Sequence, residues 1–501
     1  MMKRKKTQAV CVLFLVMLGL ASCGGQTASP AEPKETQSSG ENAQTETVTE
    51  ETGVKIEPED MGGITVTFLG VEPHGKDWVV NTYSEAFAEK ENGDPINDAI
   101  YRRNMEVEEA CNIHIAAEGT ERENVGPMAL KTILAGDDAY QVVHVTGSSA
   151  PTLLNAGNAV YDLLEISTLR LDQPWYDQNS IESQTVGGKL FNVVGDMNLR
   201  SFFSSICILM NKQMIMDYAL DDPFALVENG TWTIDRLMEM SRVVTADIDG
   251  DGKITDTDHA GFFGEESSVI WGLNAFGQQL ITSENGTPVI TLNNERTINC
   301  VEKYAELLND RALSISVNDV SAANGENKWR SKLLPMLMEN RLLFYNGTVG
   351  GALDLRSMNS DFGVIPMPKS DEAQASYYSS THPQYLSFLT IPATNKDPER
   401  TGKIVDSMEQ LSHEYIVSAV YETTLLDKVL RDAESERMLD IIFANRIYDI
   451  GTIFDWGSVK DLMLNLVKKT NPDFSSAYAK REAKIQKAID AYMALYPSGN
   501  S

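Results

Sequence analysis

The fold of this chain is decided by the stretch Ile64-Thr65-Val66-Thr67-Phe68-Leu69-Gly70. Its β-branched and aromatic residues predict a strand that ends at the glycine. Beyond a polar stretch, a proline and apolar residues at helical spacing predict a helix over 95–110. A second strand is expected directly after it, over 113–116. Strand, helix and strand in this order predict the start of a parallel sheet.

The next segments continue the same alternation. A helix is expected over 125–135, where Gly136 ends it, and the nearly all-apolar run 140–145 is typical of a buried parallel strand. The pattern predicts an α/β fold with helices on both faces of the sheet. Later strands are expected at 189–194, 206–210, 342–345, 362–365 and 385–391. The end of the chain is expected to be helical from about 398 to 496, and one face of its last helix carries Tyr478, Ile485, Ile489 and Tyr492.

The length of the chain predicts more than one lobe. The chain has 501 residues, and the part with globular composition runs over 62–497. A segment of this size is too large for a single hydrophobic core. Open α/β sheets bind ligands beyond the carboxyl ends of their strands. Two such lobes that face each other therefore predict a ligand cleft between them.

Residues 1–22 have the features of a secretory signal peptide. Four basic residues at 3–6 precede an apolar run over 9–20, which is too short to span a membrane. The segment Leu20-Ala21-Ser22-Cys23 resembles the bacterial lipobox. That resemblance implies cleavage before Cys23, its lipidation and acylation of the new N-terminus, which together give stable anchoring. The alternative is an ordinary signal peptide followed by a chance cysteine.

Residues 23–61 are expected to form a disordered tether after the lipidated cysteine. They are rich in Ser, Thr, Gln, Gly, Pro and Glu and have very few large apolar residues. Such a segment buries too little surface to offset its chain entropy. The working protein is therefore expected outside the cell, tied to a membrane that it does not cross.

Charge and cysteine content limit the classes of partner. The net charge of −30 argues against nucleic acid and against broad contact with an anionic membrane. Three of the five cysteines, Cys111, Cys207 and Cys300, lie in the globular part. We expect them to be buried thiols, and a single disulfide is the alternative.

The loop 247–258 has the spacing of a calcium-binding loop. Its positions 1, 3, 5 and 12 carry the carboxylates of Asp247, Asp249, Asp251 and Asp258. Gly252 allows the sharp turn, Lys253 offers its backbone carbonyl, and Ile254 can attach the loop to the core. Position 12 is usually Glu, so the shorter Asp258 predicts a weaker site. The alternative is an acidic turn without metal; a structural Ca²⁺ is the interpretation that we carry forward.

Several motifs together resemble the extracellular solute-binding lipoproteins of carbohydrate-type ABC transporters, the maltose-binding-like class, in the long form of Gram-positive bacteria. The motifs are 96–104, Tyr140-Gln141-Val142-Val143, Gly188-Lys189-Leu190-Phe191, Leu209-Met210-Asn211-Lys212 and Gly230-Thr231-Trp232-Thr233-Ile234-Asp235. The resemblance implies a periplasmic-binding-protein-like type II fold, with two α/β lobes around a cleft and a helical C-terminal region. It implies that lobe 1 consists of residues 62–170 and 384–430, and that lobe 2 consists of residues 171–383. The C-terminal helices over 431–497 are expected to belong mainly to lobe 2.

A sugar site needs flat aromatic platforms and hydrogen-bonding groups in a concave pocket. Aromatic candidates at strand ends and in loops are Trp78, Trp175, Trp271, Tyr345, Tyr377 and Tyr378. Polar candidates are Glu72, Asn274 and His382. Trp232, at the start of a helix capped by Thr231, and Trp456 are expected to pack in the core instead.

The resemblance implies a monomeric protein that closes on a sugar or oligosaccharide and hands it to ABC permease subunits, with no chemical step. A surface adhesin or sensor that uses the same fold is one alternative. A secreted glycan-active enzyme is the other, and it is disfavoured because the chain has no Gly-x-Ser-x-Gly, His-Glu-x-x-His or P-loop motif.

Overall fold

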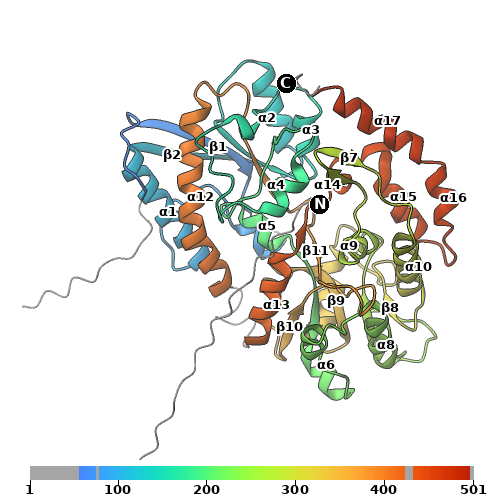
Figure 1. The fold of residues 1–501 in the computed structure, drawn as a ribbon. Helices are drawn as coiled ribbons and strands as arrows, with labels where there is room; N and C mark the ends of the chain where they lie inside the picture. Colours follow the sequence, from blue (N-terminus) through green and yellow to red (C-terminus); the bar gives the residue numbers. More distant parts are fainter. Residues whose placement is uncertain (1–55, 75–77, 424–432, 497–501) are drawn as a thin grey trace, which may run out of the picture. The chain divides into compact units, whose positions relative to one another are not determined.

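The computed structural model describes residues 56–74, 78–423 and 433–496, which belong to the unit Val54–Ser501 (Figure 1). The signal peptide, Cys23 and nearly all of the predicted tether lie outside the described residues. Within the described ranges, no helix combines the length and the apolar character needed to cross a membrane.

The first sheet has the topology that the sequence predicts. Its order is β12-β3-β1-β2, and β1 pairs in parallel with both β2 and β3. The fourth strand, β12, is antiparallel to β3. The strands are β1 (Ile64–Val71), β2 (Ile113–Thr120), β3 (Val142–Thr146) and β12 (Ser387–Thr390). The expected strand–helix alternation over 64–145 is therefore confirmed.

Helices cover both faces of this sheet. On one face, α1 (Pro95–Cys111) and the long helix α12 (Pro398–Tyr421) lie side by side over Phe68 (Figure 1). On the other face, α2 (Val125–Leu134) packs against Leu69. Neighbouring residues of a strand point to opposite faces, so Phe68 and Leu69 supply the two cores.

The second sheet is mixed, with the order β10-β4-β9-β5-β8. In it, β5 is parallel to β9 and β8, whereas β4 is antiparallel to β9 and β10. Its strands are β4 (Ile206–Asn211), β5 (Ala260–Phe263), β8 (Ser314–Ile315), β9 (Leu342–Thr348) and β10 (Phe362–Ile365). Three of the later strands predicted from sequence are these β4, β9 and β10.

The prediction of a strand at 189–194 is wrong. This segment makes only isolated bridges, such as Val193 with Leu389, although Leu190 and Val193 are fully buried. Its apolar residues serve burial under the first sheet, so the hydrophobic run alone did not identify a paired strand.

Short helices and turns fill the space around the sheets. The helices are α3 (Ala150–Leu154), α4 (Gln178–Gln184), α5 (Leu199–Phe203), α6 (Lys212–Asp217), α7 (Pro223–Glu228), α8 (Ile234–Val244), α9 (Ser268–Ala275), α10 (Glu295–Asn309) and α11 (Leu334–Met338). The 3-10 helices are η1 (Val79–Thr82), η2 (Leu163–Glu165), η4 (Val349–Leu355) and η6 (Trp456–Ser458), and η3 (Trp329–Leu333) is a π-helical turn. A small hairpin joins β6 (Thr282–Glu284) to β7 (Thr287–Val289).

The C-terminal region is mostly helical, as predicted, but its last helix is two helices. Its elements are α13 (Ala433–Ala444), β13 (Arg446–Ile447), α14 (Ile450–Phe454), α15 (Val459–Leu466), α16 (Phe474–Ala479) and α17 (Glu482–Met493). Tyr478 belongs to α16, and Ile485, Ile489 and Tyr492 belong to α17. All four are buried, so the predicted common face is a common core that a break at 480–481 divides.

Segments that join the two sheets lie side by side. Ser205 forms a bridge with Thr381, and the N–H of His382 donates to the carbonyl of Ser204 at 2.8 Å. Beside them, β11 (Ser379–Ser380) pairs in parallel with β13. These segments run between the two sheets at one place, and we call them together the strap.

The three cysteines of the described ranges are free and buried. This confirms the expected buried thiols, and the alternative of a disulfide among them is wrong.

Candidate functional site

A cavity of about 710 Å³ lies where strand ends of the two sheets come together. We call it the aromatic cavity. On the side of the first sheet, its lining includes Trp78, which comes after β1, and Ser148, which comes after β3. It also includes the segment 382–385, which comes before β12. Its second-sheet lining includes Phe263, the last residue of β5, and Tyr345, its partner in the middle of the parallel strand β9. Its volume falls within the roughly 300–1,000 Å³ that is usual for ligand pockets.

Strands β5 and β9 fix one wall of the aromatic cavity. Phe263 pairs with Tyr345 across the two strands, and their ring centroids are 4.8 Å apart. A side chain at Gly347 would approach the Tyr345 ring to 3.0 Å, so a glycine lets this ring keep its position. Burial strongly raises the pKa of the Tyr345 hydroxyl, which therefore stays a neutral hydrogen-bonding group.

A row of rings forms another part of the wall. Trp271, on α9, lies 5.6 Å from the His382 ring, and His382 lies 4.8 Å from Tyr385. The guanidinium of Arg122 stands over Tyr385 at 5.3 Å. Burial and the nearby Arg122 charge lower the pKa of His382 to about 4. His382 is therefore neutral at pH 7 and can both donate and accept hydrogen bonds.

Asn346 supplies an unused acceptor. Its side chain is 3% exposed and lines the aromatic cavity, and its Oδ1 has no hydrogen-bond partner. Its Nδ2 donates to the carbonyl of Cys207 at 3.3 Å. A buried acceptor without a partner costs about 1–3 kcal/mol. A ligand hydroxyl donated to Oδ1 would remove this cost.

Four of the nine ligand-binding candidates line the aromatic cavity: Trp78, Trp271, Tyr345 and His382. They come from four separate parts of the chain and from both sheets. Their common cavity gives each of them a position suited to ligand contact.

Three other candidates are buried in packing roles away from this cavity. Trp175 packs under α12, where its indole N–H donates to Asp406 at 3.3 Å. The Asn274 amide donates to the carbonyl of Gln278 and to Asp449, and its oxygen accepts from Ser380. The Tyr377 hydroxyl accepts the backbone N–H of Trp232. Their polar atoms are committed to the protein itself.

The last two candidates also lie outside the lining of the aromatic cavity. The Tyr378 ring lies against Gly277. Exposed Glu72 lines a smaller hollow of about 200 Å³ together with His144 and Glu85. Burial and the Arg103 charge lower the pKa of His144 to about 3.

The two tryptophans expected to pack in the core do so. Trp232 is fully buried beside Phe344, and its indole donates to the carbonyl of Pro366. Trp456 stacks on Phe454. The helix after Trp232 begins two residues later than predicted, because the cap is Thr233 and not Thr231.

Sequence reasoning missed several lining residues, among them Trp329, Tyr385 and Glu265. Trp329 is one of six tryptophans and begins the π-helical turn η3. Turns of this kind occur often at functional sites, but the sequence around Trp329 has no strand or helix signal that places it. Tyr385 begins the strand predicted at 385–391, so a signal was available for it, whereas Glu265 follows β5, a strand that was not predicted.

The acidic loop 247–258 brings three carboxylates together. Oxygen atoms of Asp247, Asp249 and Asp258 lie within 4.8 Å of one another. Asp258 is fully buried, and its carboxylate accepts the backbone N–H groups of Ile248 and Thr255 at 2.8 and 2.9 Å. Burial opposes the charge of Asp258, but these hydrogen bonds prevail and lower its pKa. A hard cation such as Ca²⁺ suits three carboxylates at this spacing.

Other loop residues stand differently. The Asp251 carboxylate lies outside the group of three and accepts the backbone N–H of Lys253 at 2.8 Å. Ile254 packs against the core of the second sheet, as predicted. The carboxylates of positions 1, 3 and 12 thus meet, and that of position 5 points to a local turn.

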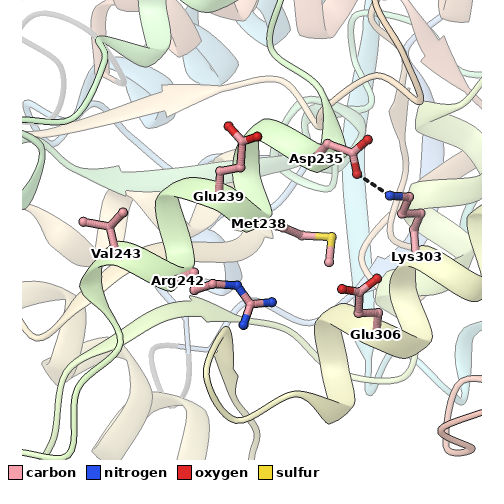
Figure 2. Close-up of a pocket in the computed structure, with 7 residues that line it drawn as sticks. All are labelled: Asp235, Met238, Glu239, Arg242, Val243, Lys303 and Glu306. Carbon is pink, nitrogen blue, oxygen red and sulfur yellow. Dashed lines mark hydrogen bonds and ion pairs between the residues drawn. The ribbon is translucent and has the colours of Figure 1, made fainter.

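A separate hollow lies between α8 and α10 (Figure 2). Most of its charged side chains are paired across the groove or with neighbours, such as Asp235 with Lys303 and Arg242 with Asp310. Exposed ion pairs of this kind are typical of a solvated helix surface. The aromatic cavity is therefore the better candidate for ligand binding.

No protein-family model and no curated protein matches this chain. Solved structures match its fold. An ABC substrate-binding protein from Listeria monocytogenes in complex with cycloalternan is 12% identical, with a TM-score of 0.53 over 85% of this chain and 99% of that one. A maltose/maltodextrin-binding domain from Bdellovibrio bacteriovorus bound to maltotriose is 14% identical, with a TM-score of 0.52 over 85% and 100%.

A cyclo/maltodextrin-binding protein complexed with maltotetraose is 13% identical, with a TM-score of 0.54 over 86% of this chain and 96% of that one. At this identity the likeness establishes the fold. The predicted fold class, α/β and periplasmic-binding-protein-like, is confirmed. These three neighbours are named as binding proteins, not as enzymes.

Proposed function

We propose that this protein binds a sugar or oligosaccharide reversibly and delivers it to an ABC permease. The observation that carries the proposal is the aromatic cavity, in which Trp78, Trp271, Trp329 and Tyr345 line one space at the strand ends. Flat rings cover the apolar faces of a pyranose, and polar groups such as Asn346 pair with its hydroxyls. The three structural neighbours with saccharide ligands support this class of ligand.

Hinge closure is the mechanism that the layout favours. The strap of Ser204–Ser205, Thr381–His382 and β13 joins the two sheets beside the cavity. A ligand that contacts Trp78 from the first sheet and Tyr345 from the second binds the closed form more tightly and raises its population. No chemical step is required.

We also propose that the mature protein is held on the outer face of the cell membrane by lipid on Cys23, with the polar segment that begins at Gly24 as its tether. The tether was predicted to reach residue 61, and this end is wrong: the N–H groups of Glu59 and Met61 donate to the carbonyls of Ala110 and Cys111, and Met61 is buried in the core of the first sheet. The lipobox-like sequence and the polar composition support this part. Labelling cells with a radioactive fatty acid tests it. Cys23→Ala should abolish the label and release the protein, and retained label would contradict the assignment.

The first experiment tests saccharide binding with the purified globular part. Tryptophan fluorescence and calorimetry are followed while a panel of mono- and oligosaccharides is added. We expect saturable binding with unchanged ligand, checked by chromatography of the sugar. Hydrolysis of a panel member would favour the enzyme alternative. If the purified protein binds a sugar but deletion of its gene leaves the uptake of that sugar by the cells unchanged, the adhesin or sensor alternative would be favoured.

The second proposal is that the acidic loop holds Ca²⁺ as a structural ion. Extracellular calcium modules bind with dissociation constants of about 10⁻⁴–10⁻³ M, so about 2 mM Ca²⁺ should stabilise the fold by about 0.6–1.8 kcal/mol. The thermal midpoint is measured before and after chelation, with Mg²⁺ as a control. An unchanged midpoint after verified calcium removal would contradict this proposal.

A further inference from the structure

Glu265 is an unusual member of the aromatic cavity. It lies between β5 and α9 and lines the cavity beside Trp271, Trp329 and Tyr345. Its Oε1 accepts the hydroxyl of Ser267 at 2.9 Å, and the side chain of Trp329 also hydrogen-bonds to its carboxylate. Both donors are neutral. They fix the orientation of the carboxylate and do not neutralise its charge.

Glu265 also has no basic neighbour at contact distance. Among the described residues, no Lys, Arg or His nitrogen lies within 4 Å of its carboxylate. The adjacent Glu266 adds a further negative charge, and its own partner is Lys468 at 3.9 Å. The N-terminus of α9 carries about half a unit of positive charge, which favours a carboxylate nearby. It does not cancel the full negative charge of the Glu265 carboxylate.

The rest of the lining does not supply the missing cation. Its other charged residues are Asp455, Lys460 and Asp461. Lys460 lies beside Asp455, whose carboxylate accepts the Lys460 backbone N–H at 2.9 Å, and Asp461 adds a further acid there. With His382 neutral, acids outnumber bases among the lining residues. Arg122 and Arg330 stand over the rings of Tyr385 and Trp78 outside the lining, and their charges are paired with Glu123 and Asp354. A partly desolvated acid of this kind is stabilised by a cation that enters with the ligand.

We propose that Glu265 makes the aromatic cavity selective for a saccharide that carries a protonated amine. The carboxylate would accept the ammonium N–H, and the aromatic rings of Trp271 and Tyr345 in the same lining would favour a cation. A sugar with carboxylate, sulfate or phosphate groups would be repelled. This inference rests on the proposed saccharide binding and adds the charge of the ligand.

Paired sugars test the inference. Each amino sugar is compared with the neutral sugar of the same ring and linkage: glucosamine with glucose, galactosamine with galactose, and deacetylated chitotetraose with cellotetraose. Calorimetry at pH 7 gives the affinity ratio within each pair. Hydrogen bonds to charged groups predict an amine preference of about 10- to 100-fold. Glu265→Gln should remove most of this preference.

Glu266→Gln is the matched control, since it removes the same charge one residue away and outside the lining. It should keep the preference, and thermal midpoints verify that both variants fold. If Glu265→Gln misfolds, the affinity ratio of the unchanged protein still decides the ligand class.

The outcomes separate this inference from the proposed function. Equal binding of amine and neutral partners, or preference for the neutral one, overturns the inference and leaves saccharide binding standing. An amine preference that survives in Glu265→Gln overturns the role of this residue. If no saccharide of either kind binds, the proposed function fails and the inference fails with it.

Discussion

The aromatic cavity and the acidic loop are both groups of polar side chains, but they are assembled in opposite ways. The loop takes its three carboxylates from twelve consecutive residues, and it is joined by hydrogen bonds within itself. The cavity takes its lining from residues between Trp78 and Leu464, on both sheets. A local site can be damaged without affecting a distant one, and an assembled site depends on every element that positions its walls. We expect changes at the two sites to affect different properties of the protein.

The largest expected effect is on stability, from Asp258→Ala in the acidic loop. The substitution removes a fully buried carboxylate and leaves the N–H groups of Ile248 and Thr255 without their acceptor. The loss of two hydrogen bonds to a charged acceptor should lower the free energy of unfolding by about 3–4 kcal/mol, with or without Ca²⁺. Urea denaturation measures this loss.

Asp251→Ala is the control for that prediction, because Asp251 is exposed and its carboxylate serves one turn. Its effect should stay below about 1 kcal/mol. Saccharide affinity of the folded Asp258→Ala protein should stay within about twofold of the unchanged protein. A large loss of affinity would show that the two regions are coupled, and the comparison above would then fail.

The next effect is on binding, from Trp329→Ala in the aromatic cavity. Trp329 is half-buried and makes part of the wall, so its removal should weaken saccharide binding by about 10- to 100-fold with little change in the thermal midpoint. Trp175→Phe is the opposite control, because Trp175 packs under α12. It should lower stability and leave affinity within about twofold. The reverse pattern would place the ligand site at Trp175.

Sequence patterns predicted the first sheet well, and the reason is local. From Ile64 to Thr146 each strand and helix follows the previous one, and each hydrophobic period matches its element. Capping supports the same boundaries: Asp94 accepts the N–H groups of Ile96 and Asn97, and Asn112 adopts the left-handed conformation that ends α1. Neighbours in sequence are neighbours in this sheet.

The composition of the cavity was harder to predict, because spatial neighbours there are distant in sequence. Trp271 and His382 are ring neighbours although 111 positions separate their numbers. Trp175 and Trp271 were equal candidates in sequence, since both were expected at strand ends or in loops. Only tertiary packing distinguishes them, because α12 covers one and the other faces the cavity.

The pH dependence of stability gives a further, smaller contrast. Unfolding returns His382 to an ordinary pKa near 6.5, whereas in the folded protein burial and Arg122 hold it near 4. As the pH falls below about 6.5, the unfolded chain takes up a proton first, so stability decreases until about pH 4. The contribution is fully present above about pH 6.5. His382→Gln should remove about 3 kcal/mol of this decrease at pH 4.

The measurement is urea denaturation between pH 4 and pH 8, with the difference between the two proteins taken at each pH. Buried His144, whose pKa is lowered to about 3, remains in both proteins and contributes the same slope to each. The pKa of Asp258 in the acidic loop is lowered, so this carboxylate titrates at a lower pH than an ordinary aspartate. A difference curve that is flat between pH 4 and pH 6.5 would contradict the neutral state of His382.

The smallest expected effect distinguishes carboxylates within the acidic loop. Asp249 belongs to the group whose oxygens lie within 4.8 Å of one another, and Asp251 does not. Asp249→Asn should therefore remove most of the stabilisation by Ca²⁺, about 1 kcal/mol, and Asp251→Asn a smaller part. The quantity compared is the calcium-dependent shift of the thermal midpoint, so any effect of each variant on the calcium-free protein cancels. Equal losses would mean that the metal draws Asp251 inward and that the loop rearranges on binding.

The aromatic cavity shares no residue with the acidic loop, so saccharide affinity should not change in either variant. This last comparison tests the independence of the two regions at its most sensitive point.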